Sequence, residues 1–130
     1  MILLLDTHFL LWLMLYPDKI SRAEQAAIES AERLHVSVVS LWEIRIKWNA
    51  RDRHGRRKGE ISPEQTLTFV VRSDMRLEPL HPDDCVAPLV PPLAHKDPFD
   101  EMLLTHAQQL GARLLTRDAR LADHPVAWIA

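Results

Sequence analysis

The chain has 130 residues, of which 47% are hydrophobic and 26% are charged, and this composition excludes an intrinsically disordered protein. Its formal net charge of −2 points to no particular partner, and its single cysteine, Cys85, excludes an internal disulfide. We therefore expect one domain over residues 1–130, located in the cytoplasm, where a lone thiol stays reduced.

The N-terminal segment Met1–Leu5 is a short apolar run typical of a strand buried on both faces, and it ends at Asp6. A charge at this position, with no basic residue before it, argues against a signal peptide. The uncharged run Thr7–Pro17 is too short to cross a bilayer, so we expect no association with a membrane. Thr7–Leu15 indicates a short, largely buried helix that Pro17 ends.

The next two helices are indicated by capping boxes. Ser21 and Glu24 predict a second helix. Its apolar face should comprise Ala23, Ala27, Ile28, Ala31 and Leu34. Val36–Val39 indicates a second strand. Ser40 and Glu43 repeat the capping-box spacing and predict a third helix that runs into a basic stretch.

The middle of the chain is less regular. Ser62 and Gln65, with proline at the first helical position between them, predict a helix that runs to about Ser73. Leu77–Leu80 indicates a short strand, and Asp83–Leu89 gives a weak helical signal. Two adjacent prolines then predict an irregular segment.

The last third of the chain contains the clearest helix, which opens at Asp97–Asp100 and ends at Gly111. Its apolar positions, at helical spacing, are Phe99, Met102, Leu103, Ala107 and Leu110. Arg113–Thr116 and Ala127–Ile129 indicate two further strands. Strands that alternate with helices predict an α/β fold, in which a central, mostly parallel, twisted β-sheet is flanked by α-helices on both faces.

Four acids lie directly after a predicted strand or in the first turn of a predicted helix: Asp6, Glu43, Asp100 and Asp118. In open α/β sheets the ligand crevice lies outside the carboxyl ends of the strands, where acids from distant positions can meet. Glu43, Asp97 and Asp118 are also explained by ordinary helix capping. Asp6 is different, because it follows a buried strand and precedes no strong helix signal, which favours a functional role.

If these carboxylates converge, they need a cation. Two carboxylates about 5 Å apart repel by about 3 kcal/mol at an effective dielectric constant near 20. Carboxylate oxygens favour Mg²⁺ or Mn²⁺, and no set of His and Cys residues has the spacing of a zinc site. A carboxylate-bound divalent ion can activate water and orient a phosphate. This pattern predicts hydrolysis of phosphodiesters.

Four motifs resemble those of the PIN-domain ribonucleases, specifically the VapC-type toxins of type II toxin-antitoxin pairs. They are Leu5-Asp6-Thr7-His8, Ser40-Leu41-Trp42-Glu43-Ile44 with Lys47, His95-Lys96-Asp97-Pro98-Phe99-Asp100, and Leu115-Thr116-Arg117-Asp118. The resemblance covers essentially the whole chain. It implies a single PIN-like domain and a Mg²⁺-dependent (or Mn²⁺-dependent) endoribonuclease that acts as a toxin, hydrolysing RNA with a metal-activated water held by the acidic cluster.

The resemblance also implies roles for individual residues and a set of partners. It identifies the catalytic and metal-binding acids as Asp6, Glu43, Asp100 and Asp118. Asp97 becomes a cap or a secondary contributor, and Thr7 and Thr116 either orient a carboxylate or a metal-bound water or serve as turn residues. The implied partners are the RNA substrate, a cognate antitoxin protein and a second copy of the chain in a homodimer.

The segment Arg45–Lys58 contains seven basic residues and one acidic residue, a net charge of +6 that leaves −8 elsewhere. It is richer in arginine than the resemblance leads us to expect, and it suits RNA phosphates, an acidic segment of an antitoxin, or plain solvation. The candidate contacts are Lys47, Arg51, Arg53, Arg56, Arg57 and Lys58. Trp48 lies beside them and could stack on a base. Trp12 and Trp42 are predicted to lie on buried faces, in the core or at an interface, and Cys85 is predicted to be buried or half-buried.

Three other functions were weighed. A non-catalytic, Mg²⁺-binding regulatory module of the receiver type would have an adjacent acidic pair after an early strand and a lysine where Asp118 stands. A phosphatase with a nucleophilic aspartate would have Asp-x-Asp where this chain has Asp6-Thr7-His8. A PIN-type nuclease of RNA processing, outside a toxin-antitoxin pair, would share the same acids. Only His8 and His95 among the histidines lie near the acid motifs.

Overall fold

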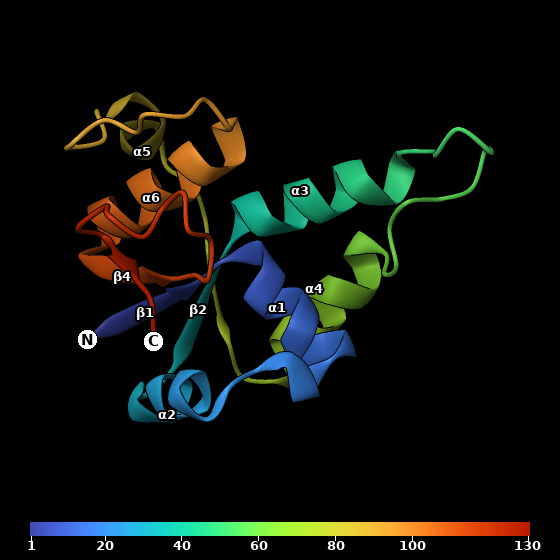
Figure 1. The fold of residues 1–130 in the computed structure, drawn as a ribbon, viewed down its shortest axis with the longest axis horizontal. Helices are drawn as coiled ribbons and strands as arrows, with labels where there is room; N and C mark the ends of the chain where they lie inside the picture. The colour runs from blue at the N-terminus through green and yellow to red at the C-terminus, as the bar shows by residue number, and fades with distance from the viewer.

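The computed structural model describes residues 1–130 and contains a five-stranded sheet (Figure 1). The strands are β1 (Ile2–Leu5), β2 (Leu34–Ser37), β3 (Arg76–Glu78), β4 (Ala112–Leu115) and β5 (Ala127–Trp128). All neighbours in the order β3-β2-β1-β4-β5 pair in parallel. The predicted α/β fold is confirmed. Since β2 and β4 lie on opposite sides of β1, the order of the strands reverses next to β1.

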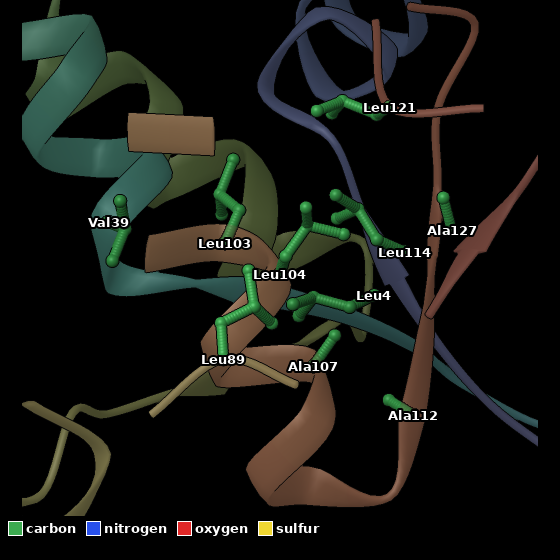
Figure 2. Close-up of a cluster of buried hydrophobic side chains, with 10 residues drawn as sticks. All are labelled: Leu4, Val39, Leu89, Leu103, Leu104, Ala107, Ala112, Leu114, Leu121 and Ala127. Carbon is green, nitrogen blue, oxygen red and sulfur yellow. The ribbon is translucent and has the colours of Figure 1, made fainter. Parts of the chain in front are cut away.

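Helices cover both faces of this sheet. They are α1 (Thr7–Leu15), a 3₁₀ turn η1 (Pro17–Lys19), α2 (Arg22–Ser30), α3 (Val38–Asn49), α4 (Pro63–Arg72), α5 (Pro82–Val86) and α6 (Pro98–Leu110). Along β1, Leu4 packs with residues of α6, while Leu3 and Leu5 pack with residues of α1 and α4. This alternation is the period of two that a strand imposes on its side chains. Figure 2 shows the first face, where Leu4, Leu104 and Leu114 lie together.

Local sequence signals set several helix ends as predicted. Both reciprocal hydrogen bonds of the capping box form at the start of α2, between Ser21 and Glu24, and at the start of α4, between Ser62 and Gln65. Gly111 ends α6 with a φ of 65°, in the left-handed region that glycine adopts without strain. The chain turns there directly into β4.

The boundary between β2 and α3 differs from the prediction. The side chain of Ser37 accepts a hydrogen bond of 3.0 Å from the backbone N–H of Val39, so α3 begins at Val38. The predicted strand Val36–Val39 is therefore wrong at its end, and the predicted capping box of Ser40 and Glu43 does not form. Both residues lie inside α3, because an earlier serine already caps the helix.

Smaller corrections concern neighbouring boundaries. The helix α2 ends at Ser30, so Leu34 belongs to β2 and not to the apolar face of α2. Strand β3 and helix α5 are shorter and begin earlier than the predicted Leu77–Leu80 and Asp83–Leu89. The predicted burial of Trp42 is wrong, since 57% of its surface is exposed, and Cys85 is exposed as well. None of the helices has the length and apolar character needed to cross a membrane.

Candidate active site

The carboxyl edge of the sheet, next to β1 and β4, brings together side chains from both ends of the chain. Asp6 follows β1 and Thr116 follows β4, and the hydroxyl of Thr116 donates a 2.6 Å hydrogen bond to Oδ2 of Asp6. A reversal of strand order at this point is where open α/β sheets form ligand crevices. The first turns of α3 and α6 lie toward the same edge, because α3 begins directly after β2 ends, and α6 ends directly before β4 begins.

Asp6 is the most buried of the four predicted acids, with 5% of its surface exposed. Its Oδ1 accepts a 3.1 Å hydrogen bond from the backbone N–H of His8, and the His8 ring lies 3.6 Å from the same atom. Burial by itself raises the pKa of Asp6, but the hydrogen bonds from His8 and Thr116 outweigh it and hold the pKa below its usual value. Asp6 is therefore ionised at neutral pH.

Glu43 lies in the second turn of α3 and faces α1. The hydroxyl of Thr7 donates a 2.7 Å hydrogen bond to Oε1 of Glu43. Because that hydroxyl has only one proton, Ser40, whose Oγ lies 2.9 Å from Thr7 Oγ1, must be the donor in the second bond. Lys47 lies one turn further along α3, with its Nζ 3.6 Å from Oε2 of Glu43. One hydroxyl and one ammonium group thus contact this carboxylate, and the Ser40 hydroxyl orients the Thr7 hydroxyl.

Asp100 lies in the first turn of α6, which Asp97 caps. The side chain of Asp97 accepts hydrogen bonds from the backbone N–H groups of Phe99 (2.9 Å) and Asp100 (3.3 Å). Burial, together with the negative charges of Asp97, Asp6 and Asp118, raises the pKa of Asp100 to about 6. Burial is the largest cause of this shift; the three carboxylates add to it, and the guanidinium of Arg120 opposes it.

Asp118 lies in a turn after β4 and not at the start of a helix, so its predicted role as a helix cap is not realised. Its backbone N–H donates to the hydroxyl of Thr116, which connects it to Asp6. Nη2 of Arg120 lies 2.8 Å from Oδ2 of Asp118 and 3.4 Å from Oδ2 of Asp100. The hydrogen bond from Arg120 lowers the pKa of Asp118, while its more distant contact leaves that of Asp100 raised.

The structure links Asp6, Asp118 and Asp100 through Thr116 and Arg120, but Glu43 bonds separately to Thr7 and Lys47. No three His, Cys, Asp or Glu side chains converge closely enough to form a ready-made metal site. The chemistry of the donors nevertheless fits Mg²⁺ or Mn²⁺, because all four side chains offer carboxylate oxygens, the ligands that these ions prefer. Arg120 contacts carboxylate oxygens of both Asp100 and Asp118, so it would compete with an ion for these oxygens.

Three residues at this site were missed by sequence reasoning. Arg120 contacts Asp118 and Asp100, Ser40 hydrogen-bonds to Thr7 beside Glu43, and His8 contacts Asp6 although it gave no sequence signal for a partner. The spacing of Arg120, two residues after Asp118, was the available signal. His95 also contacts an acid, with its Nε2 3.7 Å from Oδ2 of Asp100.

The PIN-domain family profile matches residues 3–126. The chain belongs to the PIN-domain family. Ribonuclease VapC22 from Mycobacterium tuberculosis is 33% identical to this PIN domain over 122 residues, which cover 93% of this chain and 90% of that protein. The resemblance to PIN-domain ribonucleases of the VapC type that the motifs indicated is confirmed.

Solved structures with the same fold include two VapBC complexes bound to DNA and one further toxin-antitoxin complex. VapBC from Salmonella typhimurium, bound to DNA, contains a chain with a TM-score of 0.65 and 17% identity, covering 100% of this PIN domain and 97% of that chain. A chain of VapBC2 from Rickettsia felis, bound to a promoter DNA fragment, has a TM-score of 0.63 and 14% sequence identity. The match covers 100% of this PIN domain and 98% of that chain. A chain of a toxin-antitoxin complex from Klebsiella pneumoniae has a TM-score of 0.62 and 20% sequence identity. The match covers 97% of this PIN domain and 95% of that chain. These similarities concern the fold.

The basic segment of this PIN domain forms a loop that projects beyond the end of α3, drawn in green in Figure 1. Arg51 and Arg57 pair across it in an antiparallel bridge, and Asp52 accepts hydrogen bonds from backbone N–H groups at its tip. The guanidinium of Arg57 lies 4.1 Å from the centre of the Trp48 ring and donates to the Trp48 carbonyl. Gly59 packs so tightly that a Cβ there would lie 2.6 Å from the Trp48 Cα.

The loop therefore divides its basic residues into two kinds. Arg57 is occupied by contacts within the protein, and it covers the Trp48 ring that was expected to be available for a base. The residues whose side chains are exposed and make no contact with a carboxylate are Arg51, Arg53, Arg56 and Lys58. Lys47 lies apart from them, beside Glu43.

Proposed function

We propose that this PIN domain is a metal-dependent endoribonuclease that hydrolyses RNA phosphodiester bonds and acts as the toxin of a toxin-antitoxin pair. The observation that carries the proposal is the grouping of carboxylates at the carboxyl edge of the sheet, where Thr116 lies between Asp6 and Asp118, and Arg120 contacts both Asp118 and Asp100. A site that concentrates carboxylates in this way suits a divalent cation and, with it, a phosphate group. Membership of the PIN-domain family and the similarity to Ribonuclease VapC22 support the same activity.

In this proposal Asp6, Glu43, Asp100 and Asp118 hold Mg²⁺ or Mn²⁺. When bound, the ion supplies positive charge that orients the phosphate and lowers the pKa of a nearby water. Thr116 and Thr7 fix the carboxylates of Asp6 and Glu43 through hydrogen bonds of 2.6 and 2.7 Å, so that little reorganisation is needed on binding.

Asp97 has a positioning role, because it caps the helix that carries Asp100. Lys47 places a positive charge at the rim of the acidic site, where an RNA phosphate approaches. His8 has an exposed ring next to Asp6 and lies where a leaving group could receive a proton.

The activity and the site are tested together with Asp6→Asn, which removes a charge and nearly keeps the shape of the side chain. We expect wild-type protein to cut total cellular RNA with Mn²⁺ or Mg²⁺, reversibly blocked by EDTA, and Asp6→Asn to lose at least about 100-fold in rate. The matched control is Asp18→Asn, because Asp18 is exposed and makes no side-chain hydrogen bond. Full activity in Asp6→Asn would contradict the assignment of the site.

The toxin role rests on the relatives, since the solved structures of this fold include toxin-antitoxin complexes. We expect expression of the chain alone to arrest bacterial growth, and co-expression with a cognate antitoxin to restore it. Expression of Asp6→Asn should be harmless. Harmless expression of an active protein would instead favour a PIN-type nuclease of RNA processing outside a toxin-antitoxin pair.

Further parts of the proposal concern the assembly of this single domain. We propose a cytoplasmic homodimer, in line with the unpaired Cys85 and with an apolar surface that Trp42 and Phe99 form, their rings 5.5 Å apart. The exposed loop arginines Arg51, Arg53 and Arg56 are proposed to contact RNA or the antitoxin, in which case their charges pair with phosphates or carboxylates.

A further inference from the structure

A hollow lies beside the acidic site. It is bounded by α1, the C-terminal half of α3 and the segment that follows the basic loop. It has a volume of about 310 Å³, at the lower end of the range for small-molecule sites, roughly 300 to 1,000 Å³. Its wall includes three rings, those of His8, Trp12 and Tyr16. Three ammonium groups also border it, those of Lys19, Lys47 and Lys58.

This hollow, which we call the α1/α3 pocket, adjoins the carboxylates. His8 lines the pocket and lies 3.6 Å from Asp6, and Lys47 lines it and lies 3.6 Å from Glu43. A group bound in the pocket is therefore separated from Asp6 by the side chain of His8, and from Glu43 by that of Lys47. At the far end Lys58 belongs to the basic loop, so the pocket connects the acidic site with that loop.

Contacts with neighbouring side chains hold the rings of Trp12 and Tyr16 in place. The guanidinium of Arg117 lies 4.3 Å from the centre of the Trp12 ring, and Phe9 packs edge-on against the same ring at 5.1 Å. The hydroxyl of Tyr16 donates to Glu60, the one acid in the wall, and so ties the end of α1 to the segment after the basic loop. The pocket is thus formed before a ligand arrives.

The rings in the wall favour a flat group that can stack on them, and the lysines favour phosphates attached to that group. Aromatic rings stack on nucleobases of any sequence, and lysines at the rim neutralise the adjoining backbone. An acidic peptide would use the lysines but leave the three rings without a partner. The position of the pocket, directly beside the acids that are proposed to act on a phosphodiester, also favours the substrate itself.

We propose that the α1/α3 pocket binds a nucleobase of single-stranded RNA adjacent to the scissile phosphate, with Lys47 and Lys58 on the phosphates to either side. This inference rests on the proposed ribonuclease function. The RNA strand then runs from the acidic site, through the pocket, to the exposed arginines of the basic loop. Stacking of the base, rather than contact with the acids, then determines which phosphodiester of the RNA lies at the acidic site.

The test uses binding without cleavage. A fluorescein-labelled 2′-O-methyl RNA oligonucleotide of about eight nucleotides is titrated with the full-length protein in EDTA, and its anisotropy is followed. We expect Tyr16→Ala to raise the dissociation constant about 5- to 10-fold, and Tyr16→Phe, which keeps the ring and loses the bond to Glu60, to stay within about twofold of wild type. Leu67→Ala, an exposed apolar residue on α4 outside the pocket, serves as the control and should bind as wild type does.

A second measurement does not depend on a variant. Oligonucleotides that carry 5-bromocytidine are irradiated in complex with wild-type protein, and the cross-linked residues are identified by mass spectrometry. Cross-links to His8, Trp12 or Tyr16 support the proposal. Cross-links confined to residues outside the pocket, such as Trp42, overturn it.

The outcomes separate this inference from the proposed function. If wild-type protein cuts RNA while Tyr16→Ala binds the oligonucleotide as tightly as wild type, the pocket assignment is wrong and the nuclease stands. If wild-type protein cuts no RNA but the cross-links fall in the pocket, the pocket stands as an RNA-binding site and the nuclease proposal is wrong. Weakened binding of a purified antitoxin, with oligonucleotide binding unchanged, assigns the pocket to a protein partner and overturns the inference.

Discussion

The protein buries carboxylates in two regions, and it treats them differently. On the flank of the sheet, Glu24 of α2 accepts a 2.9 Å hydrogen bond from Nε of Arg117, and this bond from Arg117 lowers the pKa of Glu24. At the carboxyl edge, the carboxylates of Asp100 and Asp118 share the single guanidinium of Arg120, and the pKa of Asp100 rises.

The difference separates acids that stabilise the fold from acids that are proposed to serve a reaction. An acid with its own cation is already neutralised, so it gains little from a bound metal ion. Acids that repel one another remain available to a cation, and the repulsion lowers the stability of the folded chain. The two regions should therefore respond in opposite ways to the loss of a carboxylate.

The largest expected effect is that of Asp100→Asn. We expect the rate of RNA cleavage to fall by at least about 100-fold, because a proposed metal ligand is lost. The free energy of unfolding should nevertheless rise, by about 0.5 kcal/mol, since the neutral amide removes repulsion with Asp6 and Asp118. Cleavage assays and thermal unfolding check the two effects. A variant that is both less stable and fully active would contradict the comparison.

The matched change on the flank is Glu24→Gln, which can keep the capping bond to the Ser21 backbone and loses the charge opposite Arg117. We expect a loss of about 1 to 2 kcal/mol in the free energy of unfolding, measured with urea. Cleavage at 25 °C should stay within about threefold of wild type. Glu29→Gln, at an exposed position on the same helix, is the control.

The pH dependence of stability provides a test of the same pair. The pKa of Glu24 is lower in the folded chain than its ordinary value of 4.5, so the ionised form stabilises the fold above that value. The contribution is lost as the pH falls through the folded pKa. The difference in unfolding free energy between wild type and Glu24→Gln should therefore be constant near neutral pH and shrink below about pH 4.5. A difference that does not change down to about pH 3 would show that the pair contributes nothing through charge.

The smallest effect is expected for Arg120→Ala. Since Arg120 occupies the space beside Asp100 and Asp118, its removal should let a cation bind more tightly. We expect the dissociation constant for Mn²⁺, measured by calorimetry, to fall about threefold. Arg113→Ala, on the strand next to β1 and remote from these acids, should leave it unchanged. Weaker binding in Arg120→Ala would indicate that the arginine holds the acids in place for the ion.

Much of this arrangement was predictable because its determinants are local. The apolar strand before Asp6, the capping boxes of α2 and α4 and the glycine after α6 each depend on a few adjacent residues. The start of α3 was not predictable in this way, since Ser37 and Ser40 both have the chemistry of a cap and only the pairing of β2 decides between them.

The contacts within the site depend on long-range pairing. The register of β1 against β4, with Leu5 opposite Leu115, places Thr116 beside Asp6 although 110 positions separate them. Nothing in the local sequence specifies this register. The exposure of Trp42 has the same origin, because helical spacing identifies an apolar position but not whether another element covers it.

Arg117 belongs to both regions of the comparison. It stands between Thr116 and Asp118 in the chain, and it is held by Glu24, by the carbonyl of Lys19 and against the ring of Trp12. These contacts immobilise the backbone on either side of it before any substrate arrives. The conformational entropy of the loop that carries Asp118 is thus lost during folding rather than during binding, so a contact made on the flank of the sheet favours affinity at its carboxyl edge.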